Sequence, residues 1–245
     1  MKRLFAAGIL CALIALVGPL RVAAQQDTDR PNLLLIVGDD TGFGDLGFTG
    51  AVTRTPNIDR LAEEGAVFTR FHASPVCSVT RAMLLTGNNP VEVGLGAFDY
   101  SLYPPAKGVP GYEAYLTRNT VTVAELLQNA GYFTAMTGKW HLGGTRHGGE
   151  GPHKWGFDRS YVIYTGGANH WNSGVFHVDM QDPAQRAAVE AGRVPKERYF
   201  ENGAQIERPV GIFSDTLWTE RMIAYLEEAR RELKPFFAYI AFTTP

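Results

Sequence analysis

Residues 32–40 read Asn-Leu-Leu-Leu-Ile-Val-Gly-Asp-Asp. Residues 33–37 of this stretch are all apolar, and Pro31 precedes the stretch. Because it lacks the polar alternation of a half-exposed strand, it predicts a strand that is buried on both faces, which is typical of a parallel sheet. The glycine and the two aspartates that follow predict a loop at the carboxyl end of this strand.

Apolar runs of this kind alternate with helical patterns along the rest of the chain. Thr122, with Glu125 three residues later, predicts a capped helix start. Residues 177–210 show no pattern that predicts an element. The alternation predicts an α/β fold with a mostly parallel central sheet flanked by helices. Strands are expected at 66–71, 132–137, 161–164 and 235–242, and helices at 55–64, 78–85, 122–128 and 214–231.

The N-terminus has the pattern of a secretory signal peptide over residues 1–24. A basic start, Met1 to Arg3, precedes an apolar run over 4–20, and Val22-Ala23-Ala24 offers small residues for cleavage. The alternative is an uncleaved anchor, but the run is shorter than the ~20 residues that a membrane span needs. We expect export to the periplasm or the medium, with no stable membrane insertion after cleavage.

Cleavage would remove three basic residues and no acidic residue, which makes the formal net charge of −2 more negative. An acidic balance argues against nucleic acid as a partner. Cys11 would leave with the leader, so that Cys77 would be the one cysteine of the mature chain. A single cysteine in an oxidising compartment either pairs between chains or is reactive, with a buried structural cysteine as the alternative.

Cys77 stands four residues before Arg81, where an apolar and helix-like run begins. A thiol at a helix N-terminus beside a guanidinium is activated, because nearby positive charge favours its anion. The same position is suited to binding an anion. The segment therefore predicts a reactive thiol next to an anion site.

Two further groups of polar residues follow predicted strands. Asp39 and Asp40 come after the first strand, and ligands of open α/β sheets bind at the carboxyl ends of strands. Adjacent carboxylates repel each other unless a cation lies between them, and oxygen ligands favour Ca²⁺ or Mg²⁺; a solvated turn is the alternative. Lys139 and His141 follow the strand at 132–137, and their spacing puts both on one side of an extended chain. Taken alone, each would more often be a solvated or a structural residue.

The ordered set of these motifs resembles the sulfatase family over residues 31–245. The set contains Asp39-Asp40, Cys77-x-x-x-Arg81 and Gly138-Lys139-Trp140-His141-Leu142-Gly143, in the family's order. The segments Thr55-Pro56-Asn57-Ile58-Asp59-Arg60-Leu61 and Phe236 to Phe242 are similar to two further landmarks of that family. The resemblance implies an alkaline-phosphatase-like fold and a sulfuric ester hydrolase of arylsulfatase type.

In that family the motif cysteine is oxidised to formylglycine, whose hydrate is the nucleophile. The resemblance implies this fate for Cys77, with a formylglycine-generating enzyme as a partner and a small-molecule sulfate ester as the substrate. It implies that Asp39, Asp40 and the hydrate at position 77 bind a divalent cation, usually Ca²⁺ and alternatively Mg²⁺.

The resemblance also implies that three further side chains act at the reacting group. Arg81 would hold the hydrate, Lys139 would bind a sulfate oxygen, and His141 would hydrogen-bond the formylglycine hydroxyl and assist turnover. We add His170, in the segment 166–171, as a candidate for the substrate pocket, with a structural role as the alternative. The loops at 87–119 and 142–157 are where we expect substrate specificity to arise.

The sequence departs from the family pattern in two respects. Val79 stands where the modification motif has a proline, and valine also favours extended backbone. The family continues past its last matching strand with a histidine, an Asp-Asn pair and a lysine, so we expect residues 25–245 to be the N-terminal portion of a catalytic domain that lacks its C-terminal part and is weakly active or inactive by itself. Two other functions stay open: a phosphate or phosphonate ester hydrolase of the same superfamily, and a non-catalytic protein that binds sulfated ligands.

Overall fold

The computed structural model describes residues 30–97, 104–144, 148–167, 169–171, 183–191, 198–209 and 211–245. The predicted signal peptide lies outside the described residues. Within the described part, residues 31–245 form one compact unit, and no helix there is long and apolar enough to span a membrane.

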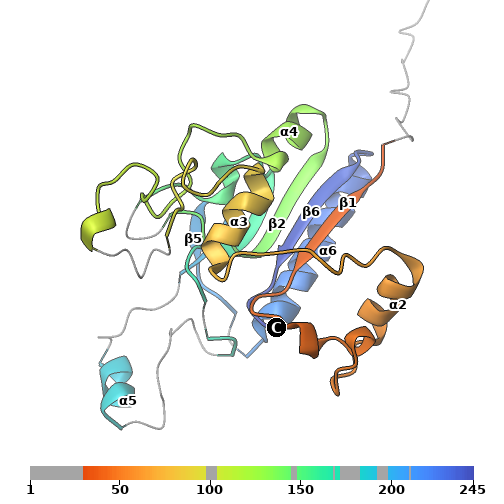
Figure 1. The fold of residues 1–245 in the computed structure, drawn as a ribbon, viewed down its shortest axis with the longest axis horizontal. Coiled ribbons are helices and arrows are strands. Elements are labelled where there is room, and N and C mark those ends of the chain that lie inside the picture. Colours follow the sequence, from red (N-terminus) through yellow and green to blue (C-terminus); the bar gives the residue numbers. More distant parts are fainter. Residues whose placement is uncertain are drawn as a thin grey trace, which may run out of the picture. The chain divides into compact units, whose positions relative to one another are not determined.

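A six-stranded sheet forms the centre of this unit, with the strand order β1-β6-β2-β3-β4-β5 (Figure 1). The first four strands in this order are parallel to one another, whereas β4 pairs antiparallel with β3 and β5 pairs antiparallel with β4. The predicted α/β fold with a mostly parallel sheet is confirmed. The strands are β1 (Leu33–Val37), β2 (Phe133–Lys139), β3 (Arg159–Ile163), β4 (Tyr199–Glu201), β5 (Ala204–Ile206) and β6 (Phe236–Ala241).

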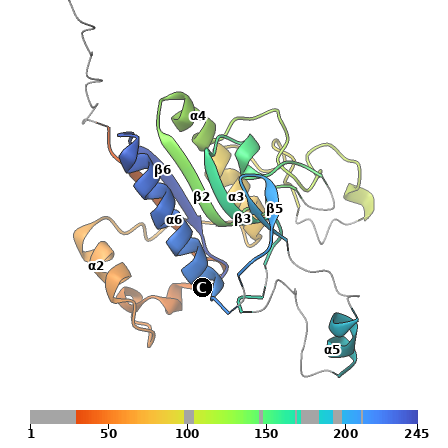
Figure 2. The same cartoon turned by 180° about the vertical axis from the view of Figure 1, so that it is seen from behind.

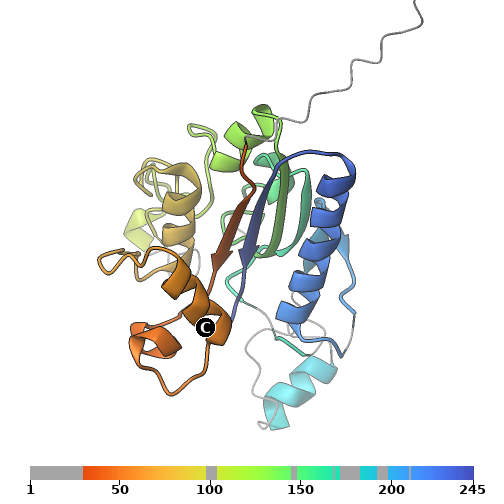
Figure 3. The ribbon, with the colours of Figure 1, turned by 90° about the vertical axis from the view of Figure 1, so that its right-hand side faces the viewer.

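Helices cover both faces of the sheet. The longest, α6, packs against β2, β3 and β6 on one face (Figure 2), while α3 and α4 lie on the opposite face (Figure 3). The start of α4 confirms its predicted cap, because Thr122 Oγ1 accepts from the Glu125 amide at 3.1 Å and the Glu125 carboxylate accepts from the Thr122 amide. The α-helices are α2 (Pro56–Glu64), α3 (Cys77–Thr86), α4 (Val123–Asn129), α5 (Pro183–Glu190) and α6 (Ser214–Arg231), and short 3-10 turns occur at Phe43–Asp45, Gly47–Thr49, Pro104–Ala106 and Pro152–Lys154.

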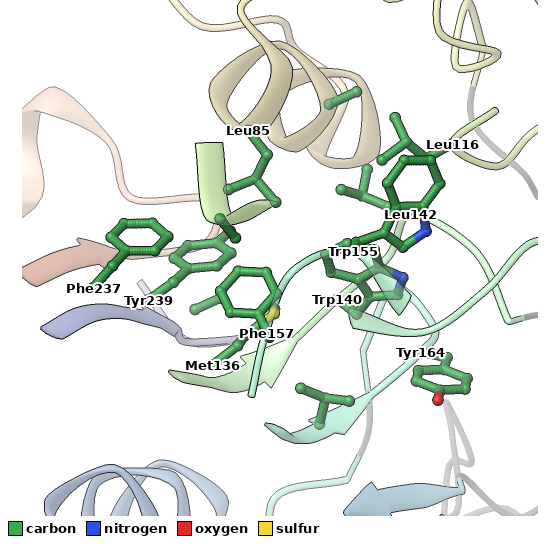
Figure 4. Packing of buried hydrophobic residues seen from close by; sticks show 14 of the residues in the cluster. Leu85, Leu116, Met136, Trp140, Leu142, Trp155, Phe157, Tyr164, Phe237 and Tyr239 are labelled. Atoms are coloured by element: carbon green, nitrogen blue, oxygen red, sulfur yellow. The ribbon is translucent and has the colours of Figure 1, made fainter. Parts of the chain in front are cut away.

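Aromatic side chains fill the core between the sheet and α3. Figure 4 shows Leu85 of α3 pointing toward the rings of Phe157 and Tyr239. The Phe157 ring stacks on Phe237 with centroids 6.0 Å apart and meets the Trp140 ring edge to face at 6.4 Å. This apolar layer includes Trp140 and Leu142, which flank His141 in the sequence, so that the polar residues at the end of β2 are held on a rigid base.

The structure corrects three sequence predictions. β1 is not buried on both faces: it is the edge strand beside β6, and Leu34 and Ile36 are each 52% exposed. Residues 66–71 form no strand, and Phe68 and Phe71 are exposed. The segment 177–210, where no element was predicted, contains α5 and the β4–β5 hairpin. Asn202 and Gly203 at the hairpin turn both have positive φ, so the Asn-Gly pair was the signal that sequence reasoning missed.

Candidate functional site

Polar residues gather where β1 and β2 end and α3 begins. Asp39 follows β1, Lys139 is the last residue of β2 and Cys77 is the first residue of α3. Gly138 makes the approach of β2 to β6 possible, because its φ is +99° and a Cβ there would lie 1.9 Å from the Ala241 carbonyl oxygen. The parallel sheet therefore brings together motifs that are far apart in the sequence.

Asp39 lies between two buried cationic side chains. Its Oδ1 accepts from Arg81 at 3.0 Å, and its Oδ2 accepts from the Lys139 ammonium at 2.5 Å. Arg81 and Lys139 are almost completely buried, and the Asp39 side chain is 11% exposed. Burial acts to raise the pKa of Asp39, but the charges and hydrogen bonds of Lys139 and Arg81 outweigh it and hold the pKa below its ordinary value. The ionised triad therefore carries one excess positive charge.

Tyr239 is a site residue that sequence reasoning missed. Its fully buried hydroxyl accepts from Arg81 Nη1 at 3.2 Å, and the same nitrogen donates to the Lys139 carbonyl oxygen at 3.0 Å. Burial raises the pKa of Tyr239, which keeps the phenol protonated. A tyrosine in an otherwise apolar strand was the available signal, because a buried hydroxyl needs a partner.

Cys77 and His141 form a second pair beside this triad. Cys77 Sγ lies 3.4 Å from His141 Nδ1, and His141 is buried with a left-handed φ of +55°. Burial acts to raise the pKa of the Cys77 thiol, but the hydrogen bond to His141 and the charges of His141 and Lys139 outweigh it, so that the pKa is lowered. The family resemblance implied that Cys77 and His141 share one site, and the structure brings them into contact.

We expect replacement of His141 by alanine to slow alkylation of the free Cys77 thiol by iodoacetamide. The substitution removes the hydrogen bond and the charge that lower the thiol pKa, so less thiolate is present at pH 7 and the rate falls by about threefold or more. The measurement is the alkylation rate against pH, whose midpoint should move to higher pH. The exposed His72 supplies the control His72→Ala; an unchanged profile in His141→Ala would contradict the assignment of this contact.

Asp40 differs from Asp39 in its surroundings. It is exposed and has a φ of +59°. The carboxylates of Asp39 and Asp40 are hard oxygen donors, which fit Ca²⁺ or Mg²⁺ by their chemistry. The described residues contain no group of three or more His, Cys, Asp or Glu side chains that could hold a metal. The four carboxylate oxygens of Asp39 and Asp40 are fewer than the six to eight oxygens that calcium takes.

His170 is tied to the start of α6. Its Nδ1 lies 2.5 Å from Ser214 Oγ, and its ring stacks on Phe213 at a centroid distance of 5.0 Å. Its carbonyl oxygen accepts from the buried Arg208. These contacts give His170 structural partners, and its role in substrate binding stays a prediction.

Val79, the residue at the departure from the modification motif, packs inside the protein. It lies in the first turn of α3 and is 8% exposed. Proline is also tolerated in the first turn of a helix. Valine at position 79 is therefore compatible with the fold of this segment. Recognition of the segment by the modifying enzyme is a separate property.

Comparisons with known proteins agree on one family. The model of the family described as Sulfatase matches residues 31–245. An uncharacterized sulfatase of Schizosaccharomyces pombe is 37% identical over 226 residues, which cover 90% of this chain and 39% of that protein. An arylsulfatase of Klebsiella aerogenes is 34% identical over 223 residues, covering 91% of this chain and 44% of that protein.

A solved structure gives the same result for the fold. The crystal structure of Ps i-CgsB in complex with k-i-k-neocarrahexaose has a TM-score of 0.67 and 29% identity, and the match covers 88% of this chain and 45% of that one. This chain thus spans less than half the length of these relatives.

Proposed function

This chain belongs to the sulfatase family, and from this premise we propose that the full-length protein hydrolyses sulfate esters of small molecules. The observation that carries the proposal is the contact between Cys77 and His141 beside a triad with excess positive charge. A sulfate ester is an anion that must receive a nucleophile at sulfur, and the positive charge lowers the repulsion between the two.

Each residue has a distinct part in the proposed reaction. Lys139 and Arg81 would neutralise the charge that develops on the sulfate oxygens. His141, whose Nδ1 faces position 77, would move a proton at the group that Cys77 provides. Tyr239 would act as a positioning residue, because its hydroxyl fixes the orientation of Arg81.

Two groups would complete this site. Formylglycine formed from Cys77 would supply a hydrated aldehyde as nucleophile, and Ca²⁺ or Mg²⁺ held by Asp39 and Asp40 would polarise the sulfate group. Because these residues provide only part of a calcium ligand set, we expect residues 25–245 by themselves to be weakly active or inactive. We further propose that a formylglycine-generating enzyme modifies Cys77 and that the protein acts in the periplasm or outside the cell, after removal of residues 1–24.

Mass spectrometry of the full-length protein from its native host, combined with an assay of turnover, tests this proposal. Trypsin releases the peptide Phe71–Arg81, which carries Cys77 and Val79. We expect the aldehyde mass in this peptide. We also expect the protein to hydrolyse an aryl sulfate faster than an aryl phosphonate, with the Cys77→Ala variant measuring background hydrolysis. Faster hydrolysis of the aryl phosphonate would instead favour a phosphate or phosphonate ester hydrolase.

A second candidate is a protein that binds sulfated ligands without turnover. Val79 favours it, because the modification motif has proline at this position. An unmodified Cys77 thiol, together with sulfate-ester binding and no hydrolysis above the Cys77→Ala background, would support this candidate and overturn the proposed hydrolase.

A further inference from the structure

Two backbone hydrogen bonds join the residues that follow β6 to the end of β1. The Asp39 amide donates to the Thr244 carbonyl oxygen at 3.2 Å, and the Phe242 amide donates to the Val37 carbonyl oxygen at 2.9 Å. Both lie at or beyond the last paired position of the two strands, where Val37 faces Ala241. The backbone of Asp39 is therefore held by the segment after β6 as well as by its own strand.

Thr244 is in turn held by the start of α6. Its hydroxyl donates to Asp215 Oδ2, and Asp215 lies in the first turn of this helix. The Asp215 carboxylate also accepts from the Ser214 hydroxyl at 3.4 Å. Ser214 is buried, and its amide donates to the His170 carbonyl oxygen at 3.1 Å, so the start of α6 is fixed in place. A hydroxyl that donates to a carboxylate makes a stronger hydrogen bond than one between neutral groups.

The position of Asp39 decides how the two buried cations beside it are arranged. Lys139 and Arg81 each donate to one oxygen of its carboxylate, and both are almost completely buried. A shift of the Asp39 backbone would move the negative charge that orients both side chains. Because a displacement of about 1 Å in charged groups can lower a reaction rate strongly, the residues that hold this backbone matter for the chemistry.

We propose that Asp215 and Thr244 form a positioning pair, which fixes the backbone of Asp39 and through it the arrangement of Lys139 and Arg81. Both residues act through Asp39 and are positioning residues. The pair links α6, on one face of the sheet, to a site that is formed with α3 from the opposite face (Figure 3). The inference rests on the proposed function for its effect on turnover, whereas the hydrogen bonds themselves do not.

Hydrogen exchange of backbone amides in the full-length protein tests the link directly. Thr244→Val removes the hydroxyl and keeps the shape of the side chain. We expect the Asp39 amide to exchange about fivefold faster, because local opening becomes easier, while the Met136 amide in the buried strand β2 keeps its rate. Thr244→Ser keeps the hydroxyl and should restore slow exchange at Asp39. The exposed Thr53 supplies the control Thr53→Val, which should leave both rates unchanged.

A second variant covers the case in which Thr244→Val does not fold. Asp215→Ala removes the acceptor of the Thr244 hydroxyl and should also accelerate exchange at Asp39 by about fivefold. The exposed Glu220 of the same helix supplies the control Glu220→Ala, which should have no such effect. Unchanged exchange at Asp39 in either variant, or an equal acceleration at Met136, would overturn the positioning pair, because the effect would then be absent or a general loss of stability.

Paired substitutions separate positioning from a merely structural contribution. If Thr244 places the charge of Asp39, then Asp39→Asn should raise the unfolding equilibrium constant less in Thr244→Val than in wild type, by about threefold or more. Asp40→Asn, at an exposed aspartate, should raise this constant equally in the two backgrounds. Equal effects of Asp39→Asn in the two backgrounds would show that Thr244 does not act through Asp39.

Turnover supplies the readout that depends on the proposed function. Thr244→Val should lower kcat for an aryl sulfate by about tenfold and change KM by less than about twofold, because the misplaced charges act mainly in the transition state. Thr244→Ser should recover most of this loss. An unchanged kcat in Thr244→Val would overturn the positioning role and leave the hydrolase intact. Conversely, a wild-type protein without turnover would refute the hydrolase, and hydrogen exchange with the paired substitutions would still decide the positioning pair.

Discussion

Replacement of Asp39 by asparagine is expected to lower the free energy of unfolding by about 3 to 5 kcal/mol. The substitution keeps the shape of the side chain but removes the one negative charge between Lys139 and Arg81, which are almost completely buried. Two buried cations would then face each other with only an amide oxygen between them. Urea unfolding followed by circular dichroism would measure the difference between the two proteins.

The neighbouring aspartate provides a matched control. Asp40 is exposed and has a φ of +59°, a conformation that asparagine tolerates. Asp40→Asn should therefore change the free energy of unfolding by less than about 0.5 kcal/mol. Equal losses in the two variants would show that the triad does not stabilise the fold through its charges.

The loss in Asp39→Asn should also depend on pH. The pKa of Asp39 is lowered in the folded protein, so its carboxylate contributes stability above the ordinary pKa of about 3.9 and loses this contribution as the pH falls through the folded value. The difference in the free energy of unfolding between wild type and Asp39→Asn should accordingly have its full size at pH 6 and should become smaller below about pH 4. A difference that grows on acidification would contradict the lowered pKa.

Replacement of Gly138 by alanine is expected to destabilise the protein by more than about 3 kcal/mol, since backbone strain and steric overlap act together. The new Cβ would lie 1.9 Å from the Ala241 carbonyl oxygen, which belongs to the backbone of β6 and cannot rotate away. The strands β2 and β6 pair in parallel at this position, so they would have to separate next to Lys139. Chemical unfolding would measure the loss of stability. A very large loss would be seen as a poor yield of folded protein.

Gly50 separates backbone strain from steric overlap. Its φ of +95° is close to that of Gly138, but a Cβ at Gly50 would meet no atom of the described residues within 4 Å. Gly50→Ala should therefore cost only the strain of a left-handed residue, about 1 to 2 kcal/mol. A cost in Gly138→Ala no larger than that in Gly50→Ala would mean that β2 and β6 tolerate the added methyl group.

Local chemistry is what the sequence predicted well. The cap of α4 was readable because Thr122 and Glu125 satisfy each other's backbone groups within one turn. The strands at 132–137 and 235–242 were readable because central parallel strands are buried on both faces and are therefore mostly apolar. The hairpin at Asn202-Gly203 was equally local, and its two residues carried a turn signal that the charged surroundings obscured.

The candidate residues at the site were also identified from the sequence, but their partners were not. Asp39 and Lys139 are 100 residues apart, and Cys77 and His141 are 64 apart. Motif order indicated that these residues share one site, whereas it could not indicate that Asp39 neutralises Lys139 or that Tyr239 orients Arg81. Such pairings depend on which strands become neighbours, and the parallel order β1-β6-β2 inserts the last strand of this chain between the other two.

The sequence by itself therefore indicated the family through the resemblance of its ordered motifs, predicted the fold class from the alternation of strand and helix patterns, and supplied candidate site residues whose catalytic roles stay predictions. The tertiary structure alone decided which face of β1 is exposed, that residues 66–71 pair with no strand, and which charges meet. The physical reason is that burial and ion pairing depend on neighbours from distant parts of the chain. An apolar run such as 32–37 fixes a preference for burial, but its position at the sheet edge decides how much of it is covered.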